Sequence, residues 1–131
     1  MGGFTIKNLM EIEDTAGPDY PGVEARFARK HIDSDHLGLT YLRYAPGVRS
    51  SPGHRHREQE EVYVVIGGSG RIRLDDEVRE LQLWDVVRIS PSTVRGVEGG
   101  PDGIELIAVG SDRPEGGDGV RADTPWPDET Q

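Results

Sequence analysis

Apolar and polar residues alternate along this chain in short runs, and glycine and proline interrupt the runs at close intervals. The runs are rich in Val, Ile, Leu, Tyr and Arg and lack the three-to-four residue spacing of an amphipathic helix. This pattern is typical of an all-β protein. We expect strands at residues 23–31, 37–45, 61–66, 70–74, 78–83, 86–89, 94–98 and 104–109.

Three segments have the composition of turns between antiparallel strands. They are GGSG at residues 67–70, DDE at residues 75–77 and GGPDG at residues 99–103. Short strands joined by such turns predict a single-domain antiparallel jelly-roll β-barrel. Its length of 131 residues fits one domain.

The two ends of the chain differ from this central pattern. Residues 1–22 predict an edge strand or a short helical turn followed by a loop, and residues 23–110 predict the barrel. Residues 111–131 are acidic and rich in Gly and Pro, so we expect a poorly ordered tail in which Trp126 can dock on the barrel.

Composition narrows the choice of partners. The chain has no cysteine, so any metal must be bound by nitrogen and oxygen. The formal net charge of −9 disfavours binding to nucleic acid or to an anionic membrane, because both are negatively charged. The chain shows neither a secretory signal nor a membrane span, which predicts a cytoplasmic protein.

The segment GHRHREQEEVY at residues 53–63 carries the main chemical signal. Side chains two residues apart in a strand point to one face, so His54 and His56 can direct both imidazoles to one point. Glu61 opens the next apolar run and can return a carboxylate there, which gives a ligand set suited to first-row divalent metals. The alternative is that the two histidines are only the polar face of a strand.

The segment HRHREQEEVYVVIGGSG resembles the first motif of the cupin family. That motif has two histidines separated by one residue, then a glutamate and a glycine. Two frames fit its spacing, one with Glu60 and Gly67 and the other with Glu61 and Gly68. We prefer Glu61, which directly precedes the apolar run, and keep Glu60 as the alternate ligand.

The segment LWDVVRISPSTVR at residues 83–95 resembles the second cupin motif, although it departs from it. Ser92 stands at the glycine position and Arg95 at the position of the last histidine ligand. A guanidinium stays protonated and cannot bind a metal. Arg95 either enters the pocket and selects an anionic ligand, or points outward to pair with Glu98 or Asp85.

Other candidate residues have simple structural explanations. Tyr63 shares the face of Glu61 and either lines the pocket or packs in the core. His31 and His36 flank a polar turn and are expected on the surface. The run VYVVI is apolar on both faces, which predicts a homodimer because the outward residues need a partner.

The resemblance implies a pocket for a divalent transition metal (Fe, Mn, Ni or Zn) and a small, anionic ligand. One hypothesis is a metal-dependent enzyme, such as an oxygenase or isomerase, with the metal on His54, His56 and Glu61. A second is a binding module without catalysis and with weak or no metal, which Arg95 favours. A third is an interaction protein with a vestigial pocket. Because the cupin fold serves many activities, the sequence leaves these alternatives open.

Overall fold

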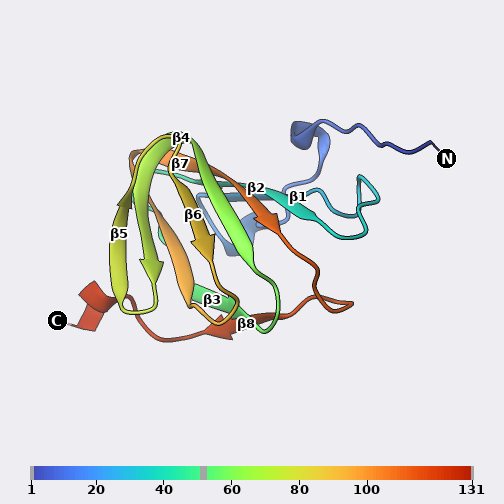
Figure 1. Cartoon of the computed structure of the whole chain (residues 1–131). Coiled ribbons are helices and arrows are strands. Elements are labelled where there is room, and N and C mark those ends of the chain that lie inside the picture. The colour runs from blue at the N-terminus through green and yellow to red at the C-terminus, as the bar shows by residue number, and fades with distance from the viewer. Residues whose placement is uncertain (1, 51–52, 131) are drawn as a thin grey trace.

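The protein is built almost entirely of strands. The computed structural model describes residues 2–50 and 53–130, and it confirms the predicted all-β jelly-roll (Figure 1). The strands are β1 (Val23–Phe27), β2 (Gly38–Tyr44), β3 (Gly53–His56), β4 (Glu61–Leu74), β5 (Glu77–Leu81), β6 (Val86–Ile89), β7 (Arg95–Gly110) and β8 (Gly119–Ala122). Short 3-10 turns form η1 (Leu9–Glu11), η2 (Gly17–Asp19) and η3 (Pro127–Thr130).

The two long strands β4 and β7 organise the sheet. They pair antiparallel over almost their whole lengths, from Glu61 opposite Gly110 to Leu74 opposite Arg95. At one end of this ladder β7 also pairs with β2, which pairs with β1, while β4 pairs with β6. At the other end β4 pairs with β5, and β3 lies between β7 and β8. Figure 1 shows the sheet curling over along β4 and β7, so that its inner surfaces face each other.

Two of the predicted turns are wrong. Residues 67–70 and 99–103 lie inside β4 and β7, where the pairing register shifts between Val65 and Gly67 and again between Gly68 and Gly70. Gly68 has a φ of +66°, and a Cβ there would overlap the carbonyl oxygen of Gly103. The glycines therefore bend two continuous strands together as bulges instead of reversing the chain. The third predicted turn is confirmed, because Leu74 pairs with Glu77 across a tight hairpin.

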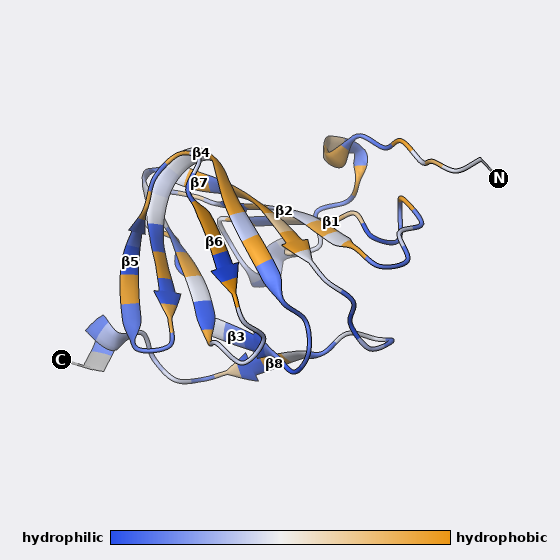
Figure 2. Ribbon diagram, in the orientation of Figure 1, coloured by the Kyte–Doolittle hydropathy of each residue, from blue (hydrophilic) through white to orange (hydrophobic). Residues whose placement is uncertain are grey.

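Strict alternation along β4 builds the core. Tyr63 and Val65 are buried in one cluster whose other members come from β4, β5, β6 and β7. Val62 and Val64 point to the other face, where they are half-buried. Figure 2 shows hydrophobic residues along β4 and its neighbouring strands. The apolar outer face is therefore as the sequence predicts, and the homodimer stays a prediction.

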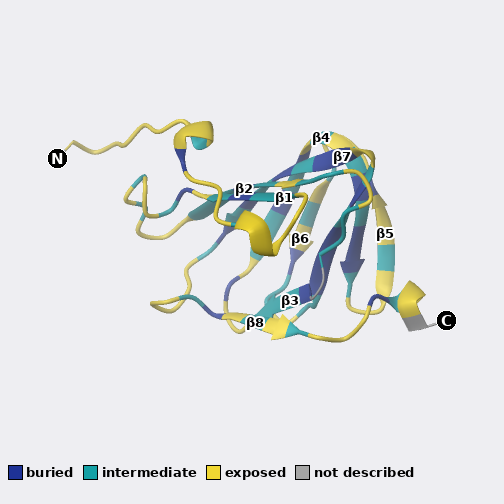
Figure 3. Cartoon of the chain, turned by 180° about the vertical axis from the view of Figure 1, so that it is seen from behind, coloured by how far each residue is buried: buried dark blue, intermediate teal, exposed yellow. Residues whose placement is uncertain are grey.

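The C-terminal segment, residues 111–130, is more ordered than the predicted tail, and we call it the C-terminal strap. Its strand β8 pairs with β3 over four residues. Beyond β8, Trp126 is 1% exposed, donates a hydrogen bond from Nε1 to the carbonyl oxygen of Ser50 at 2.9 Å and stacks under the guanidinium of Arg49. Figure 3 shows the strap running along β8, beneath β3, toward the C-terminus. Trp126 therefore docks on the barrel as predicted, and its burial adds apolar contact area that holds the strap in place.

The N-terminal segment also packs on the barrel. Ile12 is buried, the amide of Thr15 donates to the carbonyl oxygen of Ala25 at 2.9 Å, and Asp14 accepts the amide of Ala25 at 3.0 Å. These bonds hold the segment along the free edge of β1, while the first residues extend away from the barrel (Figure 1). No helix in residues 2–50 and 53–130 is long and apolar enough to cross a membrane.

The bend in β4 can be tested at Gly68. We expect Gly68→Ala to lower the free energy of unfolding by about 2–4 kcal/mol, because the new Cβ adds a backbone clash to the strain of a positive φ. Gly116→Ala is the matched control, since Gly116 has a φ of +83° and open space around its Cα. It should cost only the strain, about 1–2 kcal/mol. Urea unfolding of both variants measures the difference, and equal losses would contradict a close approach at Gly68.

Candidate functional site

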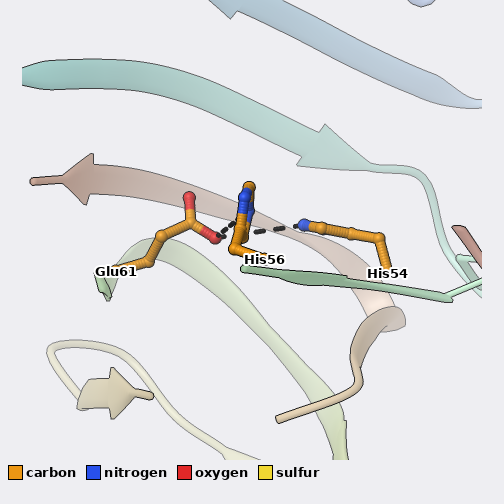
Figure 4. A group of neighbouring side chains, drawn as sticks. All are labelled: His54, His56 and Glu61. Carbon is orange, nitrogen blue, oxygen red and sulfur yellow. Dashed lines mark ion pairs between the residues drawn. The ribbon is translucent and has the colours of Figure 1, made fainter. Parts of the chain in front are cut away.

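Two short segments position the predicted ligand residues. His54 and His56 lie on β3, which is held on one side by β8 and on the other by the pairing of His54 with Arg95. Both imidazoles project from the same side of β3, as strand periodicity requires. Glu61 is the first residue of β4, and its carboxylate turns toward them (Figure 4).

The three side chains converge on one point. Nε2 of His56 lies 3.1 Å from Oε1 of Glu61, and Nε2 of His54 lies 3.9 Å from the same oxygen. One ligand atom from each residue lies within 4.8 Å of the other two. The side chain of His54 is 44% exposed, whereas those of His56 and Glu61 are 12% and 14% exposed. His54 therefore stands at the solvent side of the group, with the other two residues beneath it.

Asp118 on the C-terminal strap fixes the ring of His56. Its Oδ1 lies 2.8 Å from Nδ1 of His56, while its Oδ2 accepts the amides of Glu58 and Gln59 at 2.7 and 2.8 Å. The carboxylate thus favours a proton on Nδ1, so that in the neutral ring the Nε2 lone pair faces Glu61. Sequence reasoning missed Asp118, because its only local signal is an acidic residue in a Gly-rich segment 62 positions after His56.

The electrostatics keep the carboxylates ionised. Burial alone would raise the pKa of Glu61, but His54, His56 and the charge of Arg95 outweigh it and hold this pKa at about 2. Burial likewise opposes ionisation of Asp118, and the amides of Glu58 and Gln59 together with His56 bring its pKa to about 2. For His56, burial disfavours the charged ring, but Glu61 and Asp118 raise its pKa overall. The carboxylates therefore attract positive charge to this point.

The group fits a divalent ion. Nε2 of His56 and Oε1 of Glu61 are buried, and neither has a hydrogen-bond partner in the described part of the chain although they face each other. Ligands bound at about 2.0–2.2 Å from one ion lie roughly 3 Å or a little more apart, so only a modest movement of exposed His54 would complete the set. Two imidazoles and a carboxylate suit first-row transition metals.

Arg95 occupies the barrel interior close to this group. It is fully buried, and its Nη2 donates to the carbonyl oxygen of Ser90 at 3.1 Å. Its Nε and Nη1 have no partner among the described residues, and its charge acts on both His56 and Glu61. The side chain of Arg95 therefore lies inside the barrel and does not pair with Asp85 or Glu98, while its entry into the ligand pocket stays a prediction. Glu98 instead pairs with Arg49 and Arg71.

The structure also places the other residues that the sequence analysis considered. Glu60 is exposed and pairs with Arg88 at 3.1 Å, so it lies apart from the histidines and the structure favours Glu61 as the ligand. Tyr63 belongs to the core and also lines the pocket described below. His36 is 80% exposed and lies 3.0 Å from Asp112, and His31 is exposed at the rim of the same pocket.

A cavity of about 640 Å³ opens beside the ligand group. His54, His56 and Glu61 form part of its lining, whereas Arg95 lies behind it and is not part of the described lining. The inner faces of β1 and β2 form a wall, and residues of the N-terminal segment, including Ile12 and Thr15, close one side. The volume is in the usual range for a small-molecule site.

Comparison with known proteins agrees with this geometry. The model of the cupin domain matches residues 40–106, slightly more than half of the chain. The chain belongs to the cupin family. This finding confirms the family that the two sequence motifs predict, and it covers His54, His56, Glu61 and Arg95.

Solved cupin structures share the fold at low sequence identity. A cupin protein from Bacteroides fragilis superposes with a TM-score of 0.71 and 19% identity, covering 86% of both chains. A sugar phosphate isomerase of the cupin superfamily from Silicibacter pomeroyi superposes with a TM-score of 0.71 and 18% identity, covering 92% of this chain and 83% of that one. An oxalate decarboxylase from Bacillus subtilis superposes with a TM-score of 0.73 and 19% identity, covering 90% of this chain and 33% of that one. Identities this low show the fold alone. A search among curated proteins finds no match.

The role of Asp118 predicts the effect of a single-atom change. In Asp118→Asn the amide oxygen can still accept both backbone amides, because these bonds end on one carboxylate oxygen. The new NH₂ group would face Nδ1 of His56 and move the ring proton to Nε2, where it blocks a metal. We expect the affinity for Co²⁺, measured by its visible absorption, to fall about 10- to 100-fold.

The control for this change is Asp112→Asn, which alters a similar pair between an aspartate and His36 on the surface. It should leave Co²⁺ affinity unchanged. Equal affinity of wild type and Asp118→Asn would show that Asp118 does not orient a ligand.

Proposed function

We propose that the protein is a metal-dependent cupin that binds a divalent transition ion (Fe, Mn, Ni or Zn) through His54, His56 and Glu61 and acts on a small, anionic molecule in the adjacent cavity. One observation carries this proposal: two buried ligand atoms, Nε2 of His56 and Oε1 of Glu61, face each other without a hydrogen-bond partner in the described part of the chain. Buried polar atoms without partners are costly, and a shared cation removes that cost.

The protein residues would divide the work around the ion. A bound metal would supply a Lewis acid or redox centre and leave coordination positions for a substrate. Asp118 holds the proton on Nδ1 of His56, which keeps Nε2 available. The largely apolar wall of β1 and β2 excludes water from one side of the substrate. The isomerase and decarboxylase of similar fold show that such barrels serve catalysis in other proteins.

A second function, ligand binding without catalysis, is favoured by Arg95. Its guanidinium is permanently charged and buried close to the ligand group. Two like charges a few ångströms apart repel by about 1–4 kcal/mol at the effective dielectric of protein surfaces. Metal affinity should therefore be lower than in a site with a fourth histidine, and measuring metal content distinguishes the two functions.

The metal assignment is tested by two histidine variants. We expect His56→Ala to remove most of the metal from protein purified without an affinity tag, because it deletes a ligand at the centre of the group. His36→Ala should retain full metal content, since His36 lies on the surface beside Asp112. Elemental analysis of both proteins measures the metal, and equal contents would reject the assignment.

Restoring the missing ligand tests the position of Arg95. We expect Arg95→His to raise Co²⁺ affinity tenfold or more, equivalent to about 1.4 kcal/mol, because it replaces a buried positive charge with a neutral ligand. Arg73→His is the control, since Arg73 is a buried arginine whose guanidinium is bound to the strap at Thr124. Unchanged Co²⁺ affinity in Arg95→His would place the side chain too far away to affect the ion.

A further inference from the structure

The cavity has a positively charged rim apart from the metal ligands. Arg29 and Lys30 follow β1, and Arg113 follows β7 on the C-terminal strap. All three line the same cavity as His54, His56 and Glu61. Glu13 is the only other carboxylate in the described lining. We call Arg29, Lys30 and Arg113 the basic rim.

The basic rim gathers positive charge around one opening of a protein whose net charge is −9. Six other arginines pair with carboxylates, whereas no ion pair of the described residues includes Arg29, Lys30 or Arg113. Further basic residues, such as Arg43 and Arg57, also form no ion pair in the described part of the chain, so what distinguishes the rim is that its three members line one cavity. Their positive potential would attract an anion to the cavity.

Arg29 is held in place by its surroundings. Its Nη2 donates to the carbonyl oxygen of Ser111 at 3.2 Å, and the side-chain Nε2 of Gln59 donates to the same oxygen at 3.0 Å. Gly38 leaves room for the guanidinium, because a Cβ there would lie 2.9 Å from Nη2. Gln59 itself is buried and lines the cavity. A positioned guanidinium loses less entropy when it binds an anion than a free side chain does.

The wall next to the rim is mostly apolar. Inward residues of β1 and β2 contribute Val23, Ala25, Phe27 and Leu42, and Thr40 and Tyr44 on β2 add two hydroxyl groups. A wall of this composition would bind a hydrocarbon or aromatic body, whereas a molecule rich in hydroxyl groups would replace few of the hydrogen bonds that it makes to water.

We infer that the ligand is an amphipathic acid whose anionic group binds at the basic rim while its apolar body lies along the wall of β1 and β2. The inference rests on the proposed function for the identity of the cavity as the substrate site. It differs in placing anion recognition on Arg29, Lys30 and Arg113, at the mouth, and not on buried Arg95 or on the metal. The other end of the ligand is then left to reach His54, His56 and Glu61.

Three six-carbon probes separate these features by isothermal titration calorimetry. Hexanoate carries both the apolar body and the charge, 1-hexanol carries only the body, and gluconate carries the charge on a polyhydroxylated body. We expect wild-type protein to bind hexanoate at least fivefold more tightly than either of the other two. Gluconate binding as tightly as hexanoate would overturn the apolar part of the inference.

The rim itself is tested by the double variant Lys30→Gln/Arg113→Gln. Hexanoate affinity should fall about three- to tenfold, and hexanol affinity should stay constant, because only charge is removed from exposed positions. Lys7→Gln/Arg43→Gln is the control, which removes the same charge from exposed residues outside the cavity lining. Equal hexanoate affinity in both double variants would overturn the assignment to the rim.

Metal dependence separates this inference from the proposed function. The titrations are made on chelator-treated protein and on Co²⁺-loaded protein. If the protein binds hexanoate more tightly than hexanol without metal, and Lys30→Gln/Arg113→Gln abolishes this difference, the result supports anion binding at the basic rim, even if Co²⁺ fails to bind. A preference that requires Co²⁺ and survives in the rim variant would place the carboxylate on the metal and overturn the inference.

Discussion

The antiparallel pairing of β4 with β7 is the constraint on which the other features depend. It joins Glu61 to the end of β7 and places Arg95 opposite the far end of β4. Because both strands bend at glycines and continue, one pair of strands serves both halves of the curled sheet. The bend brings Glu61 and Arg95, at opposite ends of this ladder, close enough to interact electrostatically.

His56 joins the barrel to the C-terminal strap. On one side its ring meets Asp118, and on the other it faces Glu61. The strap is fixed by β8 and by the burial of Trp126, where Arg49 both stacks on the indole and pairs with Asp128. The strap lies outside residues 40–106, which the cupin domain matches, yet its packing orients the ring of His56 within those residues.

Opposite charges are separated along the cavity. The carboxylates of Glu61 and Asp118 favour a cation beside the histidines, while the basic rim favours an anion at the mouth. Arg95 lies behind the ligand group and limits how strongly a cation is held there. The arrangement is suited to a ligand with an acidic group at one end and a metal-binding group at the other.

Features that depend on local pattern could be predicted from the amino-acid sequence. Strand alternation placed Tyr63 and Val65 inside, the short polar hairpin after Leu74 formed as predicted, and the spacing of His54, His56 and Glu61 predicted their convergence. Composition at residues 67–70 and 99–103 was ambiguous, because glycine permits a bulge as readily as a turn. The choice between a bulge and a turn depends on which backbone lies opposite, and that follows from the packing of β4 against β7. The same reason applies to Asp118, Arg95 and the basic rim: their partners are distant in sequence, and contacts of that kind leave no periodic signal in the chain.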